Sequence, residues 1–140
     1  MIPTAAKRNK RFEFRLDVRS GVPVYRQIID QVMGGIAAGA LVAGHQLPTV
    51  RQLAVDLSIN PNTVLRAYRE LEIRGILDTQ QGTGTFISQQ KLKRDEVERQ
   101  RGLNQLAGEF IARAGAAGFT LQELIEQLQG MQNDVEPKRR

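Results

Sequence analysis

The 140-residue sequence predicts a mainly helical fold with one small β-hairpin. Three observations lead to this prediction: apolar side chains recur at helical spacing in several segments, a Gly-rich turn separates two short apolar runs, and apolar residues make up 41 % of the chain. The 13 Gly and 5 Pro residues are ordinary for a globular protein. No apolar run approaches the roughly 18 residues that a membrane span requires. We therefore expect one soluble, cytoplasmic domain with no membrane partner.

The N-terminal part predicts an arm, a strand and a helix. Residues 1–11 lack apolar periodicity and predict a flexible basic arm. Residues 12–18 alternate strictly between apolar and polar types, which predicts a half-buried strand. Residues 23–39 place apolar side chains at helical spacing after Pro23, which suits a first helical turn. The apolar side of the expected strand consists of Phe12, Phe14, Leu16 and Val18.

Two further helices follow, separated by a tight turn. Thr49 is a favourable N-cap, and residues 50–57 carry an apolar stripe that predicts a short second helix. Residues 58–60 form a three-residue turn. The third helix is expected over 61–74, with Asn60 as its N-cap and Pro61 in its first turn.

The remaining sequence predicts a hairpin and a pair of helices. Residues 76–79 and 85–88 are short runs around a turn that contains two glycines, as in a β-hairpin. A long helix, a Gly/Ala loop and a short helix are expected within residues 91–130. The short helix begins at a capping-box sequence that starts at Thr120.

The order helix, helix, turn, helix and hairpin is the layout of a winged helix-turn-helix. We therefore predict a basic arm (1–11), a winged helix-turn-helix DNA-binding domain (12–90), a short C-terminal helical hairpin for dimerisation (91–130) and a disordered tail (131–140). The apolar stripe of 91–130 is more than one helical hairpin can bury, so it implies a partner, either the winged domain or a second subunit. Its residues are Leu103, Leu106, Phe110, Ile111, Leu121, Leu124 and Leu128.

Residue types needed for most catalysis are scarce. The chain has no cysteine and one histidine, His45, so disulfides, thiolate sites and multi-histidine metal sites within one chain are excluded. Glu123 and Glu126 are spaced like some metal-binding carboxylates, but without a histidine they are better explained as a solvated helix face. No acid, base and nucleophile converge in the sequence, so we expect no enzyme, no metal and no cofactor.

Charge favours a nucleic-acid partner, although its distribution matters more than its sum. The net charge is +5 and the isoelectric point about 10.1, but the excess lies in the N-terminal residues 1–19. On the third helix, Asn62, Arg66 and Arg69 share the sector opposite the apolar stripe. Such amide and guanidinium groups contact base edges and phosphates. The alternative is a solvated face on which Arg66 pairs with Glu70.

These segments resemble GntR-type bacterial transcription regulators. Residues 44–54 are similar to the family signature around the second helix, 60–77 to the recognition helix and 81–87 to the wing, and the entry 21–28 also matches. The Asn-Pro-Asn-Thr-Val form of residues 60–64 and the short helical tail point to the YtrA-like subfamily. The resemblance implies a dimeric repressor, often of operons that encode ABC-type transporters. Some GntR subfamilies place arginines where this chain has Pro61 and Leu65.

We expect the duplex DNA surface to combine the ends of two helices with the hairpin tip. Arg51 should face outward from the second helix, with an arginine stacked on the protein's own surface as the alternative. The glycines at 82 and 84 are interpreted as a wing tip, because a strand rather than a helix follows them. The expected DNA-binding residues are Thr49, Arg51, Asn60, Asn62, Thr63, Arg66, Arg69, Thr83, Gly84 and Thr85.

Taken with the resemblance, the sequence predicts a sequence-specific transcriptional regulator that acts as a homodimeric repressor on a palindromic operator. The alternative is an architectural or adaptor winged-helix protein without operator specificity. No residue pattern assigns a small-molecule effector.

Overall fold

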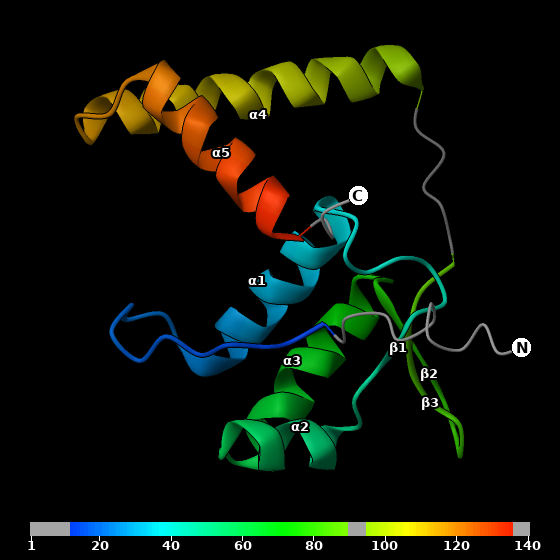
Figure 1. The fold of residues 1–140 in the computed structure, drawn as a ribbon. Helices are drawn as coiled ribbons and strands as arrows, with labels where there is room; N and C mark the ends of the chain where they lie inside the picture. The colour runs from blue at the N-terminus through cyan, green and yellow to red at the C-terminus, as the bar shows by residue number, and fades with distance from the viewer. Residues whose placement is uncertain (1–11, 90–94, 136–140) are drawn as a thin grey trace, which may run out of the picture. The chain divides into compact units, whose positions relative to one another are not determined.

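The computed structural model describes residues 12–89 and 95–135, and the chain divides into two compact units, Met1–Gln90 and Lys91–Arg140. The first, the winged unit, holds three helices and a three-stranded antiparallel sheet in the order β1-β3-β2. The second, the helical unit, holds two helices (Figure 1). The elements are α1 (Val24–Ala37), β1 (Gln46–Leu47), α2 (Val50–Leu57), α3 (Pro61–Ile73), β2 (Leu77–Gln80), β3 (Gly84–Ile87), α4 (Glu96–Ala116) and α5 (Leu121–Val135). The predicted mainly helical fold class with a small wing is confirmed.

The two helices of the helix-turn-helix begin at the predicted caps. The Thr49 hydroxyl accepts a hydrogen bond from the Gln52 amide at 3.1 Å, and the Gln52 side chain accepts one from the Thr49 amide at 3.0 Å. The Asn60 side chain accepts from the Asn62 amide at 2.8 Å. Between the helices, Ser58 adopts a left-handed conformation with φ 56°, which ends α2 and turns the chain into α3.

The core of the winged unit lies where α1, α3 and the sheet meet. The buried side of α3 is the predicted one, formed by Val64, Ala67, Tyr68 and Leu71. Gly35 of α1 has a packing reason, because a Cβ there would lie 2.6 Å from the Phe12 ring and 3.0 Å from Leu41. The glycine therefore lets these two side chains close over the helix. The buried core consists of Phe14, Ile28, Ile29, Val32, Leu41, Leu47, Leu53, Ala54, Val64, Ala67, Tyr68, Leu71, Leu77 and Ile87.

The strand predicted over 12–18 is wrong. Phe12, Phe14 and Leu16 do turn inward, but the segment joins no sheet and Val18 is 90 % exposed. Side chains of α1 satisfy its backbone instead: Gln31 accepts from the Arg15 amide and donates to the Arg15 carbonyl, and Gln27 does the same for Asp17. Alternation was thus a correct signal for burial, whereas the hydrogen-bond partners are glutamine side chains rather than a neighbouring strand.

One strand and two helix boundaries also differ from the prediction. Strand β1, which pairs with β3 through Gln46 opposite Phe86 and Leu47 opposite Thr85, was not predicted because two residues carry no periodicity. Helix α1 is shorter than 23–39. Helix α5 continues to Val135, so the disordered tail predicted from residue 131 is wrong up to 135. The basic arm 1–11 and residues 136–140 lie outside the described residues.

The helical unit is a hairpin without an interior. Thr120 caps α5 as predicted, because its hydroxyl accepts from the Glu123 amide at 3.1 Å while the Glu123 carboxylate accepts from the Thr120 amide at 3.0 Å. From this turn α4 and α5 diverge (Figure 1). None of the residues described in 95–134 is buried, and Ala114 and Leu124 alone among them are half-buried. Within the described residues of both units, no helix is long and apolar enough to cross a membrane.

Candidate nucleic-acid interface

The outward face of α3 is open to solvent and mixed in chemistry. Asn62, Arg66 and Arg69 are exposed on it, as the helical spacing predicts, and Leu65 is half-buried among them. Together with Glu70 and Ile73 they line an open hollow of about 400 Å³. In a major groove, an amide can pair with the donors and acceptors of base edges, a guanidinium with the acceptors, and an aliphatic side chain with thymine methyl groups.

Arg66 does not form the alternative ion pair. Its guanidinium carbon lies 3.7 Å from the centre of the Tyr25 ring, which belongs to α1. Glu70 pairs with Arg74 instead, at 3.2 Å. Sequence reasoning missed Tyr25, because nothing in the spacing of α1 and α3 reveals which residues meet across them.

Three arginines of the winged unit form ion pairs with acidic neighbours. Arg15 pairs with Glu13, Arg26 with Asp30 and Arg74 with Glu70. Within residues 12–89, the basic side chains without such a pair are Arg19, Arg51, Arg66 and Arg69.

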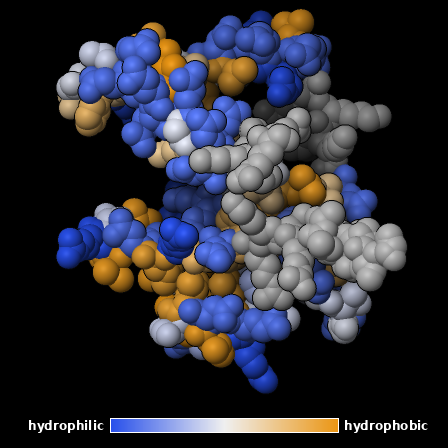
Figure 2. Space-filling model, in the orientation of Figure 1, coloured by the Kyte–Doolittle hydropathy of each residue, from blue (hydrophilic) through white to orange (hydrophobic). Residues whose placement is uncertain are grey.

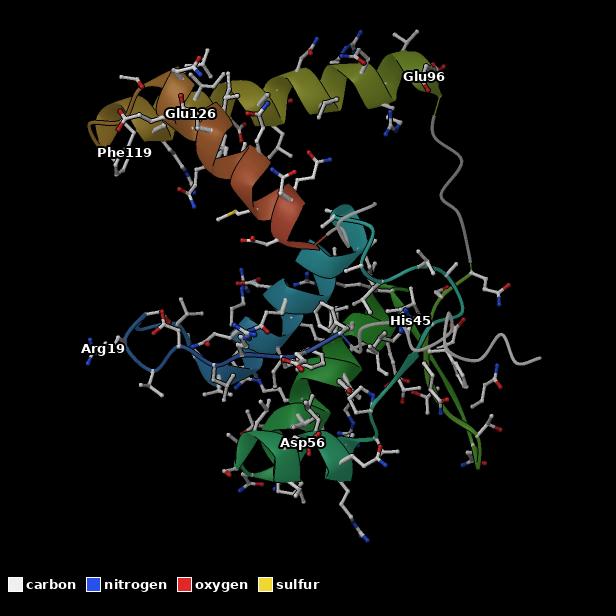
Figure 3. All side chains as sticks on the ribbon, viewed as in Figure 1. Arg19, His45, Asp56, Glu96, Phe119 and Glu126 are labelled. Atoms are coloured by element: carbon white, nitrogen blue, oxygen red, sulfur yellow. The ribbon has the colours of Figure 1, made fainter. Side chains whose placement is uncertain are left out.

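The unpaired cations gather on the helix-turn-helix, with one exception. Arg51 lies in the first turn of α2, while Arg66 and Arg69 lie on α3. Arg19 projects from the turn before α1, at the left of the winged unit in Figure 3. Asp56, labelled on α2 in the same view, is an acidic neighbour on that helix. Free positive charge therefore accompanies the two helices that sequence reasoning assigned to DNA.

Three predicted contact residues also shape the backbone. The Thr49 hydroxyl and the Asn60 carboxamide oxygen accept hydrogen bonds from the first turns of α2 and α3, so both are engaged as caps although their side chains are exposed. Thr63 is half-buried, and its amide donates to the Asn60 carbonyl at 3.0 Å. These residues present the N-terminal ends of both helices, where remaining amides attract phosphate.

The wing tip is braced by a residue from outside the hairpin. The Gln46 side-chain amide donates to the Thr83 carbonyl at 3.2 Å, and a Cβ at Gly84 would lie 2.7 Å from the same nitrogen. Gly84 has φ +135°, a conformation that favours glycine. In Figure 1 the wing tip and α2 both lie at the lower end of the winged unit.

Thr85 requires a correction. It was expected among the DNA-binding residues, but Thr85 is only 7 % exposed. Burial alternates along β3, and Thr85 falls on the buried side, paired with Leu47 of β1 and Thr79 of β2. Of the three predicted wing residues, Thr83 is exposed and Gly84 half-buried. Sequence reasoning also missed Gln46, which lies on the unpredicted strand β1.

The described residues contain no group of three or more His, Cys, Asp or Glu side chains that could hold a metal ion. His45 lies in the connection that leads to β1 (Figure 3), where its carbonyl accepts from the Ile87 amide at 2.8 Å.

The helical unit exposes a large apolar surface. The predicted residues Leu103, Leu106, Phe110 and Ile111 are exposed on α4, and orange side chains lie among blue ones over this unit in Figure 2. Phe119, which projects from the turn in Figure 3, was not predicted because it lies between the helical stripes. The exposed large apolar residues of the unit are Val97, Leu103, Leu106, Phe110, Ile111, Phe119, Leu121, Ile125, Leu128 and Met131, while Leu124 is half-buried.

The comparisons with known proteins match the winged unit and, for some relatives, most of the chain. The family described as "Bacterial regulatory proteins, gntR family" matches residues 24–87, which span the helix-turn-helix and the wing. The chain is 40 % identical over 120 residues to the HTH-type transcriptional regulator Rv1152 of Mycobacterium tuberculosis, covering 86 % of the chain and 94 % of that protein. It is 38 % identical over 122 residues to the HTH-type transcriptional repressor YtrA of Bacillus subtilis, covering 86 % and 93 %.

A solved structure agrees with the sequence relatives. A GntR family transcriptional regulator from Listeria monocytogenes is 33 % identical with a TM-score of 0.57, covering 82 % of this chain and 98 % of that one. The family and these relatives are transcriptional regulators rather than enzymes. The chain therefore belongs to the GntR family of bacterial regulatory proteins, in its YtrA-like subfamily, and is a DNA-binding transcription regulator.

Proposed function

We propose that the chain acts as a homodimer that binds a palindromic operator and represses transcription. The observation that carries this proposal is the contrast in what the two units expose. The winged unit keeps Arg51, Arg66 and Arg69 free of ion pairs on its helix-turn-helix. The helical unit exposes apolar side chains of both helices and buries none that the structure describes.

On the DNA side, the N-terminal end of α3 enters the major groove. Asn62, Thr63 and Arg66 are proposed to reach base edges, because a helix-turn-helix directs this end at the bases. Arg51 of α2 and Arg69 of α3 are proposed to contact the duplex beside these base-reading residues. Thr49 and Asn60 present helix N-terminal amides to phosphates. Thr83 and Gly84 place the wing tip against the adjacent minor groove.

On the protein side, the apolar face of α4 and α5 is proposed to pack against the same face of a second copy. Side chains such as Phe110 and Leu128 are about half exposed within one chain. Burying an apolar side chain fully contributes roughly 1.5–3 kcal/mol, so a face of this size favours association. A two-fold dimer presents two recognition helices related by symmetry, and its operator is then palindromic.

Repression is proposed from the similarity to a transcriptional repressor over most of both chains. The YtrA-like resemblance likewise supports an operon for a transporter as the target. A regulator that acts on bacterial DNA works in the cytoplasm.

The experiment that tests this proposal begins with selection of duplexes from a random library by the full-length protein. We expect a palindromic consensus that is retained against random duplex by a factor of roughly 10³ or more. An architectural protein would bind without a consensus, and an adaptor would bind no duplex. Footprinting the promoter upstream of its own gene then asks whether the consensus lies there.

The chain offers a matched pair of arginines for the site itself. Arg51→Ala should weaken operator binding, with a salt slope smaller by about one if the contact is to phosphate, or a loss of roughly 1–3 kcal/mol at one position if it reads a base. Arg19→Ala removes an equally unpaired exposed cation from the turn before α1 and should change binding much less. Equal losses in the two variants would mean that charge alone, rather than placement, decides binding.

A further inference from the structure

The stacked pair of Tyr25 and Arg66 joins α1 to the exposed face of α3. The guanidinium carbon of Arg66 lies 3.7 Å from the ring centre, close enough for the ring to cover one face of the guanidinium. Tyr25 is half-buried in the first turn of α1, where it packs against the core. Its hydroxyl makes no hydrogen bond within the described part of the chain. The Tyr25 ring is therefore held by packing, and its face contacts the Arg66 side chain of α3.

Stacking of this kind restricts an arginine without using its donors. The five N–H groups of a guanidinium lie in its plane and point outward from its edge. A ring over one face leaves that edge available for a bidentate contact with guanine or phosphate. An exposed arginine otherwise loses rotamer freedom when it binds, and a platform that holds it beforehand reduces that cost.

The two neighbouring arginines lack such a platform. Arg51 and Arg69 are exposed on α2 and α3, and neither has an ion pair or an aromatic contact among the described residues. Of these three arginines, Arg66 is the one whose side chain contacts α1, a helix outside the helix-turn-helix. Among these three arginines, Arg66 alone therefore has a ring contact that places its guanidinium.

We infer that Tyr25 is a positioning residue for operator reading: its ring holds the Arg66 guanidinium in the orientation in which Arg66 discriminates between bases. This inference rests on the proposed function, because it needs an operator to discriminate. It assigns a specificity role to a residue of α1, a helix outside the helix-turn-helix. Arg51 and Arg69, without a platform, contribute mainly affinity.

The test compares Tyr25→Leu with Tyr25→Phe in the full chain, on the duplex selected from a random library and on its single-base variants. Tyr25→Leu should lower affinity for the selected duplex roughly 2–5-fold and affinity for random duplex less. Tyr25→Phe keeps the ring face and should behave as the original protein. Phe12→Leu, which removes another half-buried ring packed on the same core, should leave the ratio of the two affinities unchanged. Circular dichroism checks that every variant is folded.

A double-mutant cycle shows whether Tyr25 acts through Arg66. Tyr25→Leu should add no loss when Arg66→Ala is already present, whereas it should have its full effect beside Arg69→Ala. In the free protein, the ring current of Tyr25 should shift the NMR signals of the Arg66 side chain upfield, and Tyr25→Leu should abolish that shift.

Several outcomes would overturn the inference. An unchanged affinity ratio in Tyr25→Leu, additivity with Arg66→Ala, or absence of the ring-current shift would each do so. A tighter complex in Tyr25→Leu would mean that the ring withdraws Arg66 from DNA instead of presenting it. Failure of the original protein to select any consensus would overturn the proposed function and this inference with it, whereas the first three outcomes leave the proposed function intact.

Discussion

Both units of this chain carry apolar stripes on their helices, but the winged unit buries its stripes and the helical unit leaves them exposed. In the winged unit, α1 and α3 turn their stripes toward each other and toward the sheet, and every buried residue that the structure describes lies there. In the helical unit, α4 and α5 carry stripes of comparable spacing that stay exposed. An apolar stripe thus identifies a surface to be covered, but does not tell whether the covering element belongs to the same chain.

The difference follows from the number of elements that meet. Three helices and a sheet enclose side chains such as Ile28 and Leu71 from all directions. Two helices that diverge from a turn can cover each other only near that turn, where Ala114 and Leu124 are half-buried. The winged unit is therefore expected to hold its structure by itself, whereas the helical unit is expected to need the proposed partner.

The largest effect is expected in the core of the winged unit. Leu71→Ala removes a fully buried side chain of α3 and should lower the free energy of unfolding by about 2–5 kcal/mol. Ile73→Ala, two residues along the same helix at a position that is 85 % exposed, should change it by less than about 0.5 kcal/mol. Thermal and urea denaturation measure both. Similar costs for the two variants would contradict the assigned core.

In the helical unit the corresponding change should affect assembly. Phe110 is 48 % exposed in one chain, so Phe110→Ala should cost the dimer about 1.5–3 kcal/mol when both copies are counted, which weakens association roughly 10–100-fold. Gln105→Ala on the polar side of α4 serves as the control. Sedimentation at several concentrations gives the dissociation constants. A Phe110→Ala protein that associates as tightly as the original would place the interface elsewhere.

The next prediction concerns the wing tip, the part of the proposed DNA surface that Gln46 supports. Gly84→Val forces a side chain onto a backbone with φ +135° and against the Gln46 side chain, at a cost of roughly 1–3 kcal/mol. Binding to operator and random duplex should both weaken, with base preferences largely kept. Gly82→Val imposes a similar backbone strain at φ +79° in open space. If it weakens binding as much as Gly84→Val, the contact with Gln46 is unimportant.

A smaller effect is expected at the hydroxyl that ties α3 to the segment before α2. The Tyr68 hydroxyl donates to the Pro48 carbonyl at 2.7 Å, and Tyr68→Phe should cost about 0.5–1.5 kcal/mol. Burial raises the pKa of the Tyr68 phenol above its usual range. Above pH about 10 the unfolded chain then releases this proton while the folded protein keeps it, so stability falls as pH rises.

The Phe variant isolates that contribution. Its unfolding free energy, measured by urea denaturation between neutral and strongly alkaline pH, should fall less steeply above pH about 10 than that of the original protein. An identical alkaline decline in both proteins would mean that Tyr68 does not contribute to it.

Local signals account for much of what could be predicted. Thr49 and Asn60 are short polar residues that accept bonds from free helix amides, so the starts of α2 and α3 were visible in the sequence. Helical spacing likewise placed Asn62, Arg66 and Arg69 on the outside of α3. The same signals failed at β1, where two residues are too few to show a period, and at the start of the chain, where alternation appeared without a sheet.

By itself, the sequence determined which segments are helical, where the helix-turn-helix begins and turns, and which side of each helix is apolar. These properties depend on residues within a few positions of one another. The tertiary structure alone decided that Gln27 and Gln31 form hydrogen bonds with the backbone of residues 12–18 and that Thr85 points inward. It also decided that the Gln46 side chain bonds to the wing tip and that the Tyr25 ring contacts Arg66. Most of these contacts join residues that are well separated in the chain. A periodic pattern predicts which side of an element a side chain faces, but not which residue it contacts.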